Sequence, residues 1–136
     1  MNRALLPLLL LLLPPHAQAR EVTSVGALEA AIATSVTAGR PVVLEFGADW
    51  CPNCRTLDKT LRDPDVQSKL RCADLIVVNL TRGAADPGAA KITQRYRLAG
   101  LPTLAFLDPE GTEHEELRLI GPVSGSRVQL GLAGVC

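Results

Sequence analysis

Trp50-Cys51-Pro52-Asn53-Cys54 lies between an apolar run at residues 42–44 and a segment with helical leucine spacing at residues 57–61. This order predicts that a strand delivers two cysteines onto the first turn of a helix. The first turn of a helix leaves backbone N–H groups unpaired, and the helix dipole places partial positive charge there. A thiolate at Cys51 is therefore favoured over the thiol, and the thiolate is the species that attacks a disulfide sulfur.

Cys54 follows Cys51 by three residues, so it can reach a mixed disulfide formed at Cys51 and resolve it. Two other interpretations of the pair are a static structural disulfide and half of a metal site. So short a loop removes little chain entropy, which argues against the first. Zinc would need two further ligands, and the candidates Cys72, His114 and Cys136 form no second paired motif. We therefore expect a redox pair, with no metal and no cofactor.

Residues 1–19 have the pattern of a secretory signal peptide. Arg3 supplies a positive charge, residues 5–13 are mostly apolar, and Ala17-Gln18-Ala19 has the small residues of a cleavage signal. The apolar run is too short for a membrane span, which needs roughly 20 residues. We expect residues 20–136 to form one exported domain in the periplasm, without stable membrane insertion after cleavage.

The charges of the chain are balanced. It has 14 Lys and Arg residues against 14 Asp and Glu residues, and no basic stripe. A surface that binds nucleic acid or anionic lipid is typically strongly basic. We therefore expect no nucleic-acid partner.

Apolar periodicity predicts alternating strands and helices over most of the domain. Expected strands cover residues 21–23, 42–46 and 75–80. Helices are expected to begin after Ser24, at Pro52, and at two places where aspartate precedes proline, Asp63-Pro64 and Asp86-Pro87. This alternation is typical of a parallel sheet, and the unbroken apolar character of residues 42–44 favours a central strand.

The end of the chain has a different pattern. Residues 103–107 and 115–120 flank the turn sequence Asp108-Pro109-Glu110-Gly111, so we expect two strands that pair antiparallel. A weakly patterned helix is expected to begin at about Ser124 or Ser126. The predicted fold class is α/β, with a parallel core, a C-terminal antiparallel hairpin and helices on both faces of the sheet.

The chain resembles the thioredoxin family in this order of elements and in two motifs. One is residues 48–55, Ala-Asp-Trp-Cys-Pro-Asn-Cys-Arg, and the other is Gly100-Leu101-Pro102-Thr103. Within the family, residues 40–44, 63–66 and 101–111 are similar to the C-terminal periplasmic domain of the thiol:disulfide interchange protein DsbD. The Pro-Asn dipeptide between the cysteines departs from that relative.

The resemblance implies roles for further residues. Glu45 matches a buried acid that would take the proton from Cys54 as it attacks; alternatively, Glu45 lies on a solvated part of the strand. Pro102 would follow a cis peptide bond opposite the cysteines, and the backbone of Leu101 would pair with an incoming peptide. The alternative for Pro102 is an ordinary trans proline. Trp50 would cover the cysteines and offer contact surface, or serve ordinary packing.

Cys72 and Cys136 leave two interpretations open. A structural disulfide would need Cα atoms within about 7 Å of each other. The alternative is a buried Cys72 with a free Cys136. His114 lies in acidic, turn-like surroundings, so we expect a surface residue rather than a catalyst.

These patterns predict an exported protein thiol:disulfide oxidoreductase in which Cys51 is the nucleophile and Cys54 the resolving thiol. We expect it to act as a reductant of oxidised periplasmic proteins. The alternatives are an oxidase or isomerase of the same fold, or a non-catalytic thioredoxin-like binding module. Its partners would be protein thiols and disulfides and an upstream electron donor that the sequence does not identify, for which a membrane thiol carrier is one candidate.

Overall fold

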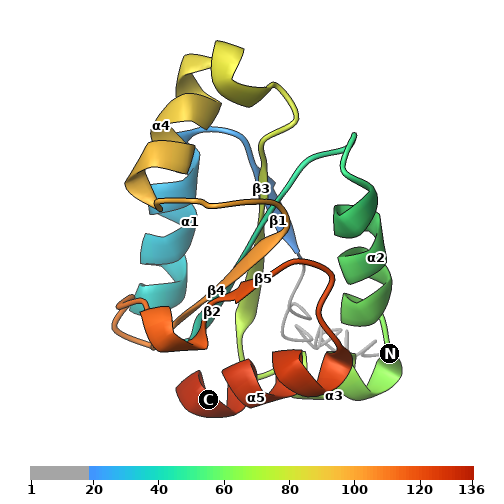
Figure 1. Cartoon of the computed structure of the whole chain (residues 1–136). Coiled ribbons are helices and arrows are strands. Elements are labelled where there is room, and N and C mark those ends of the chain that lie inside the picture. Colours follow the sequence, from blue (N-terminus) through green and yellow to red (C-terminus); the bar gives the residue numbers. More distant parts are fainter. Residues whose placement is uncertain (1–18) are drawn as a thin grey trace, which may run out of the picture.

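The computed structural model describes residues 19–136, in which a mixed five-stranded sheet lies between two layers of helices (Figure 1). The expected signal peptide, residues 1–19, lies outside the described residues except for Ala19. In the described part of the chain, no helix is long and apolar enough to cross a membrane.

The sheet has the strand order β1-β3-β2-β4-β5. Its strands are β1 Arg20–Val22, β2 Val42–Gly47, β3 Asp74–Asn79, β4 Thr103–Leu107 and β5 Leu119–Ile120. Strands β1 and β2 both pair parallel with β3, while β4 pairs antiparallel with β2 and with β5. The predicted parallel core, central strand and antiparallel C-terminal pair are therefore confirmed.

The helices begin where the capping residues predict. They are α1 Val25–Thr37, α2 Pro52–Leu61, α3 Pro64–Leu70, α4 Pro87–Arg95 and α5 Gly125–Val135, with single 3-10 turns η1 Gly83–Ala85 and η2 Glu115–Leu117. The side chains of Ser24, Asp63 and Asp86 each accept a backbone N–H from the first turn of α1, α3 and α4. These caps satisfy donors that a helix start otherwise leaves unpaired.

The strand predicted at residues 115–120 is wrong in its first half. Glu115–Leu117 forms η2, and only Leu119–Ile120 pairs with β4. Arg118 binds Glu113 through two guanidinium nitrogens, at 2.8 Å each, and His114 contacts Glu116. These contacts close the segment into a turn, and its glutamates have low strand propensity.

Each face of the sheet has its own apolar core. Helices α1 and α4 cover one face, and α2, α3 and α5 cover the other (Figure 1). Side chains alternate along β2, so Leu44 and Phe46 face α1 and α4 while Val43 faces the other layer. The same alternation places Glu45 on the face that α2 covers.

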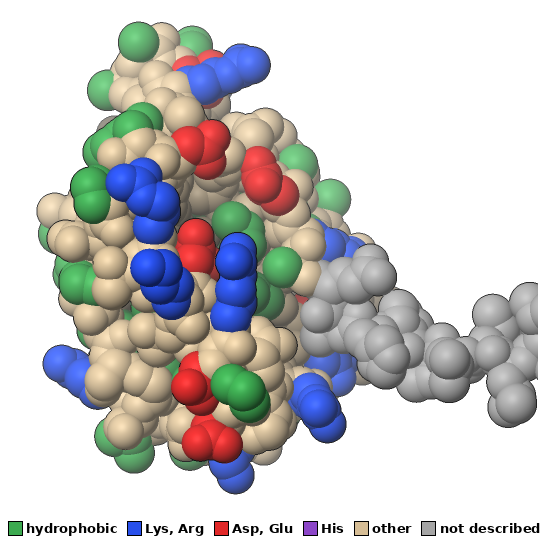
Figure 2. All heavy atoms as spheres, turned by 90° about the vertical axis from the view of Figure 1, so that its right-hand side faces the viewer, with side chains coloured by type: hydrophobic (Ala, Val, Ile, Leu, Met, Phe, Trp, Pro, Cys, Tyr) green, Lys and Arg blue, Asp and Glu red, His purple; other side chains and the backbone are tan. Residues whose placement is uncertain are grey.

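The outer surface on the α2 side carries charges of both signs. Lys and Arg side chains lie interspersed with Asp and Glu side chains on this face (Figure 2). Because neither sign dominates there, the face has no extended field of one sign.

Candidate redox site

Cys51 and Cys54 lie at the start of α2, directly after β2. The Cys51 Sγ accepts the backbone N–H of Cys54 at 3.2 Å, and Pro52 is the first residue of the helix. The two cysteines form a disulfide with their Cα atoms 5.2 Å apart. The predicted placement at a helix N-terminus is confirmed, so the positive end of the helix dipole lies at the Cys51 sulfur.

The loop around Pro102 lies against the two cysteines. Both cysteines are 5 % exposed and form an apolar cluster with Ala48, against which Leu101 packs. The Leu101–Pro102 peptide bond is cis, and the Pro102 carbonyl accepts the Gly121 N–H at 2.9 Å. The trans interpretation of Pro102 is therefore wrong, and the loop implied by the resemblance is present.

Trp50 lies at the rim of the site rather than in the core. Trp50 is 60 % exposed, and its Nε1 donates a hydrogen bond to the Thr81 carbonyl at 3.0 Å. The Asp49 N–H donates to the Thr81 hydroxyl at 2.9 Å, and that hydroxyl donates to the side-chain oxygen of Asn79. These bonds tie the loop before the cysteines to the loop after β3. No local pattern indicates Thr81, because its contacts depend on β2 and β3 ending side by side.

Glu45 is a buried carboxyl group, only 4 % exposed, so the interpretation of a solvated strand residue is wrong. Burial raises the pKa of Glu45 to about 8; a hydrogen bond with Asp58 and the negative charge of Asp58 act in the same direction, while Arg62 opposes them. A carboxyl group with a pKa near neutrality can exchange a proton under working conditions.

Asp58 is a site residue that the Cys-x-x-Cys motif does not indicate. It lies on α2 four residues after Cys54, and residues at this spacing share one face of a helix. A carboxylate in that position, together with Glu45 on the preceding strand, is the signal that identifies it. The structure brings both carboxyl groups together beneath the redox helix.

His114 lies outside the redox site, in the connection from β4 to β5. Its two ring nitrogens contact Asp108 and Glu116, each at 3.2 Å. Hydrogen bonds to Asp108 and Glu116 raise the pKa of His114. The residue expected at the surface is thus partly exposed, with a side chain that is 34% exposed. Across residues 19–136, no group of three or more His, Cys, Asp or Glu side chains is arranged to hold a metal ion.

Cys72 and Cys136 form a second disulfide, with their Cα atoms 6.0 Å apart. The disulfide interpretation of this pair is therefore confirmed. Cys72 lies just before β3, whose first residue pairs with the first residue of β2. The redox site follows the other end of β2, so the two disulfides lie at opposite ends of the sheet.

A family model described as thioredoxin-like matches residues 22–109. The chain belongs to the thioredoxin-like family. This thioredoxin-like chain is 34% identical over 108 residues to the thiol:disulfide interchange protein DsbD 1 of Pseudomonas aeruginosa. It is 36% identical over 107 residues to DsbD of Citrobacter koseri. The alignments cover 79% and 78% of this chain but only 18% of each relative, so the chain spans a small part of their length.

Two solved structures resemble the thioredoxin-like chain along most of its length. The oxidised C-terminal domain of DsbD from Neisseria meningitidis has a TM-score of 0.73 and 26% identity, with 85% of this chain and 99% of that chain covered. A thioredoxin from Thermus thermophilus has a TM-score of 0.68 and 27% identity, with 87% of each chain covered. The predicted thioredoxin fold and the resemblance to the DsbD C-terminal domain are confirmed.

Proposed function

We propose that this chain is a protein thiol:disulfide oxidoreductase that reduces disulfide bonds in other proteins through Cys51 and Cys54. The observation that carries the proposal is the position of the Cys51 sulfur, at the N-terminus of α2 and packed beside the cis Leu101–Pro102 loop. The relatives reported above are thiol:disulfide interchange proteins by name, which supports the same chemistry.

The reaction passes two electrons from the cysteine pair to the client. The Cys51 thiolate attacks one sulfur of the client disulfide, which forms a mixed disulfide and releases the first client thiolate. Cys54 then loses its proton and attacks the Cys51 sulfur. This step releases the second client thiolate and leaves the Cys51–Cys54 disulfide, which an upstream dithiol must reduce before the next cycle.

Glu45 and Asp58 assist the second step by handling the proton of Cys54. Glu45, which holds a proton at neutral pH because of its raised pKa, accepts the Cys54 proton as it passes its own proton to the carboxylate of Asp58. The pair therefore acts as an assisting acid or base.

Exposed apolar side chains beside the cysteines form the client-binding surface. Trp50 is 60 % exposed and Ile120 is 53 % exposed. Ile120 pairs with Thr103, directly after Pro102, so it borders the cis-proline loop. An extended client segment would pair with the Leu101 backbone as an added strand and rest its side chains on these residues.

We further propose that the protein works in the periplasm after removal of residues 1–19. The support is the charge, apolar run and small-residue cleavage pattern of that segment. The upstream electron donor is a dithiol, either a membrane thiol carrier or another protein.

Trapping of the mixed disulfide tests this function. Reduced Cys54→Ser protein mixed with oxidised insulin should form a stable covalent adduct at Cys51, because the resolving thiol of Cys54 is absent. The Cys51→Ser variant is the matched control and should form little adduct. Reduced wild-type protein should reduce insulin to free thiols. The binding-module alternative would be supported instead if the folded Cys54→Ser variant formed no adduct at Cys51 and the reduced wild-type protein reduced no insulin.

A further inference from the structure

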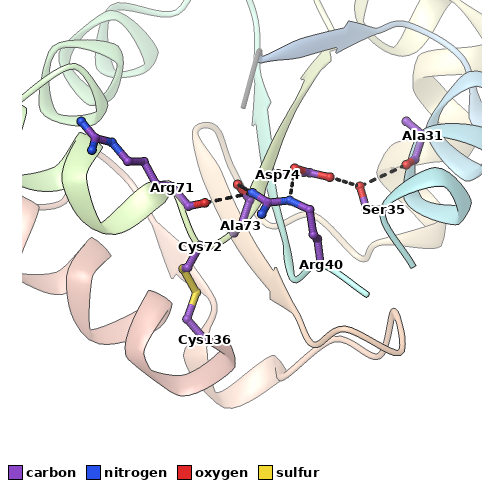
Figure 3. Close-up of polar contacts among 8 residues, drawn as sticks. All are labelled: Ala31, Ser35, Arg40, Arg71, Cys72, Ala73, Asp74 and Cys136. Atoms are coloured by element: carbon purple, nitrogen blue, oxygen red, sulfur yellow. Dashed lines mark hydrogen bonds and ion pairs between the residues drawn. A yellow bond between two sulfur atoms is a disulfide. The ribbon is translucent and has the colours of Figure 1, made fainter. Parts of the chain in front are cut away.

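The second disulfide joins two segments that are held in different ways, and the Cys72 side is firmly fixed (Figure 3). The Nη2 of Arg40 donates to the carbonyls of Arg71 and Ala73, at 2.9 and 3.0 Å, one on each side of Cys72. The Nε of Arg40 donates to Asp74, the first residue of β3, at 2.7 Å. These bonds hold the main chain around Cys72 to the sheet whether or not its sulfur is bonded.

On the other side of the disulfide, Cys136 directly follows helix α5, which has little local stabilisation. The 11 residues of α5 include the glycines Gly125, Gly131 and Gly134, and glycine is among the least favourable residues in a helix. Ser124, at the N-cap, makes no side-chain hydrogen bond to the first turn. Helix α5 therefore depends on tertiary contacts rather than on its own propensity.

Close packing supplies part of those contacts. A Cβ atom on Gly131 would lie 2.3 Å from the ring of Phe106, so the helix backbone rests directly on that ring. Val128 and Leu132 are fully buried in the core that also contains Leu57 of α2. After Leu132 the helix has one more buried residue, Val135, before Cys136. Gly134 also packs closely on Leu117. The disulfide is the one covalent tether of this last turn.

Solvent reaches this disulfide through an open groove between α3 and α5. The groove has a volume of about 730 Å³ and is lined by both cysteines together with Lys69, Gln129 and Leu130. Cys136 is exposed, and Leu130 is 71 % exposed. A thiol reductant can therefore approach the Cys136 sulfur from this groove.

We propose that the Cys72–Cys136 disulfide is a thiol-sensitive clamp on α5. A dithiol reductant is the reaction partner: one of its thiolates attacks the Cys136 sulfur, forms a mixed disulfide and releases the Cys72 thiolate. The second thiol of the reductant then attacks the mixed disulfide, releases Cys136 as a thiolate and leaves the reductant as a disulfide. Two electrons pass to the cysteine pair.

Release of the clamp has a local consequence. Cys72 stays in place because Arg40 holds its main chain, while the last turn of α5 loses its covalent tether and opens more often. The opened turn uncovers the core beneath α2, so the redox state of this pair tunes the stability of the helix that carries the redox site. Neither Cys51 nor Cys54 takes part in this clamp.

The exported protein with Cys51→Ser and Cys54→Ser tests the clamp separately from the redox site. Without denaturant, dithiothreitol should release two thiols from the folded protein, counted by alkylation and mass spectrometry. Hydrogen exchange of the amides of residues 131–136, measured relative to exchange in β2 and β4, should then become at least about tenfold faster than in the oxidised protein. Adding Cys72→Ser and Cys136→Ser is the matched control, and it should reproduce the fast exchange without reductant.

Three results would each overturn the clamp. The first is a disulfide that resists dithiothreitol until the protein is denatured. The second is release of two thiols with unchanged exchange in α5. The third is exchange that rises by the same factor in β2 and α5, which would show a loss of global stability with no added local opening of α5. The reductant experiment decides the matter even if the variant with four serines does not fold.

Discussion

The carboxyl group of Glu45 on β2 is buried and pairs with that of Asp58 on α2. Burial raises the pKa of Glu45 to about 8, and hydrogen bonding to Asp58 and the negative charge of Asp58 act in the same direction. The bond crosses the interface between the central strand and the redox helix. It therefore couples the protonation of the site to the stability of the fold.

Glu45→Gln should change how stability depends on pH. The pKa of Glu45 rises from an ordinary value of 4.5 to about 8 on folding, so the folded state holds a proton that the unfolded state releases. The stabilising contribution is complete below about pH 4.5 and is lost as pH rises through about 8. The glutamine variant lacks this loss and should be more stable than the wild type at pH 9, by about 1–3 kcal/mol.

Urea unfolding at pH 5, 7 and 9 measures this effect. Glu110→Gln, in the exposed turn after β4, is the matched control and should keep the wild-type pH dependence. If the free energy of unfolding of the Glu45→Gln variant depended on pH as that of the wild type does, the raised pKa of Glu45 would be contradicted.

Alkylation of the reduced protein should label Cys51 before Cys54. The Cys51 sulfur lies at the helix N-terminus and accepts the Cys54 N–H at 3.2 Å, and both features favour its thiolate. Protein with Cys72→Ser and Cys136→Ser leaves only the two site thiols to compete for iodoacetamide near pH 7. Mass spectrometry that finds Cys54 labelled faster would reverse the assigned roles.

Gly131→Ala should destabilise the protein, because its new methyl group would meet the Phe106 ring at 2.3 Å. Overpacking of this kind typically costs about 1–3 kcal/mol. Gly26→Ala in α1 is the matched control: nothing lies within 4 Å of its Cβ position, so it should be neutral or stabilising by up to about 1 kcal/mol. Denaturant unfolding compares the two, and equal effects would contradict the close packing of α5.

Loss of the Cys72–Cys136 disulfide should lower the free energy of unfolding of the whole domain, measured by urea unfolding. The bond joins residues 64 apart in sequence, and closing a loop of that size restricts the unfolded chain. Cys72→Ser/Cys136→Ser should therefore lower the free energy of unfolding by about 2–4 kcal/mol. An unchanged unfolding midpoint in urea would show that the bond does not stabilise the fold.

Local sequence signals predict most of the fold. The caps Ser24, Asp63 and Asp86 act within a single helical turn, so the sequence around each is enough to place a helix start. The sequence pattern predicts a strand at residues 115–117. They form a 3-10 turn instead, because Arg118 and His114 bind neighbouring glutamates. Such contacts depend on the turn that brings the side chains together.

The site is predictable to a similar degree. The Cys-x-x-Cys motif indicates Cys51 and Cys54, and the resemblance to the thioredoxin family indicates Pro102. Neither the motif nor the resemblance indicates Asp58 or Thr81, because their contacts form only when α2 and the end of β3 lie beside β2. The pairing of Cys72 with Cys136 depends likewise on the docking of α5, which the weak pattern of that helix does not reveal.

The reduction potential of the Cys51–Cys54 pair tests the central claim, that the protein is a reductant, most directly. Strong stabilisation of the Cys51 thiolate would make the Cys51–Cys54 pair oxidising. The negative charge of Asp58, beside the proton-holding Glu45, opposes such stabilisation. Equilibration of the Cys72→Ser/Cys136→Ser protein with glutathione redox buffers measures the potential of this pair alone. A value near the roughly −270 mV of thioredoxin is the predicted result, and a value near the roughly −120 mV of the oxidant DsbA would contradict the reductant function.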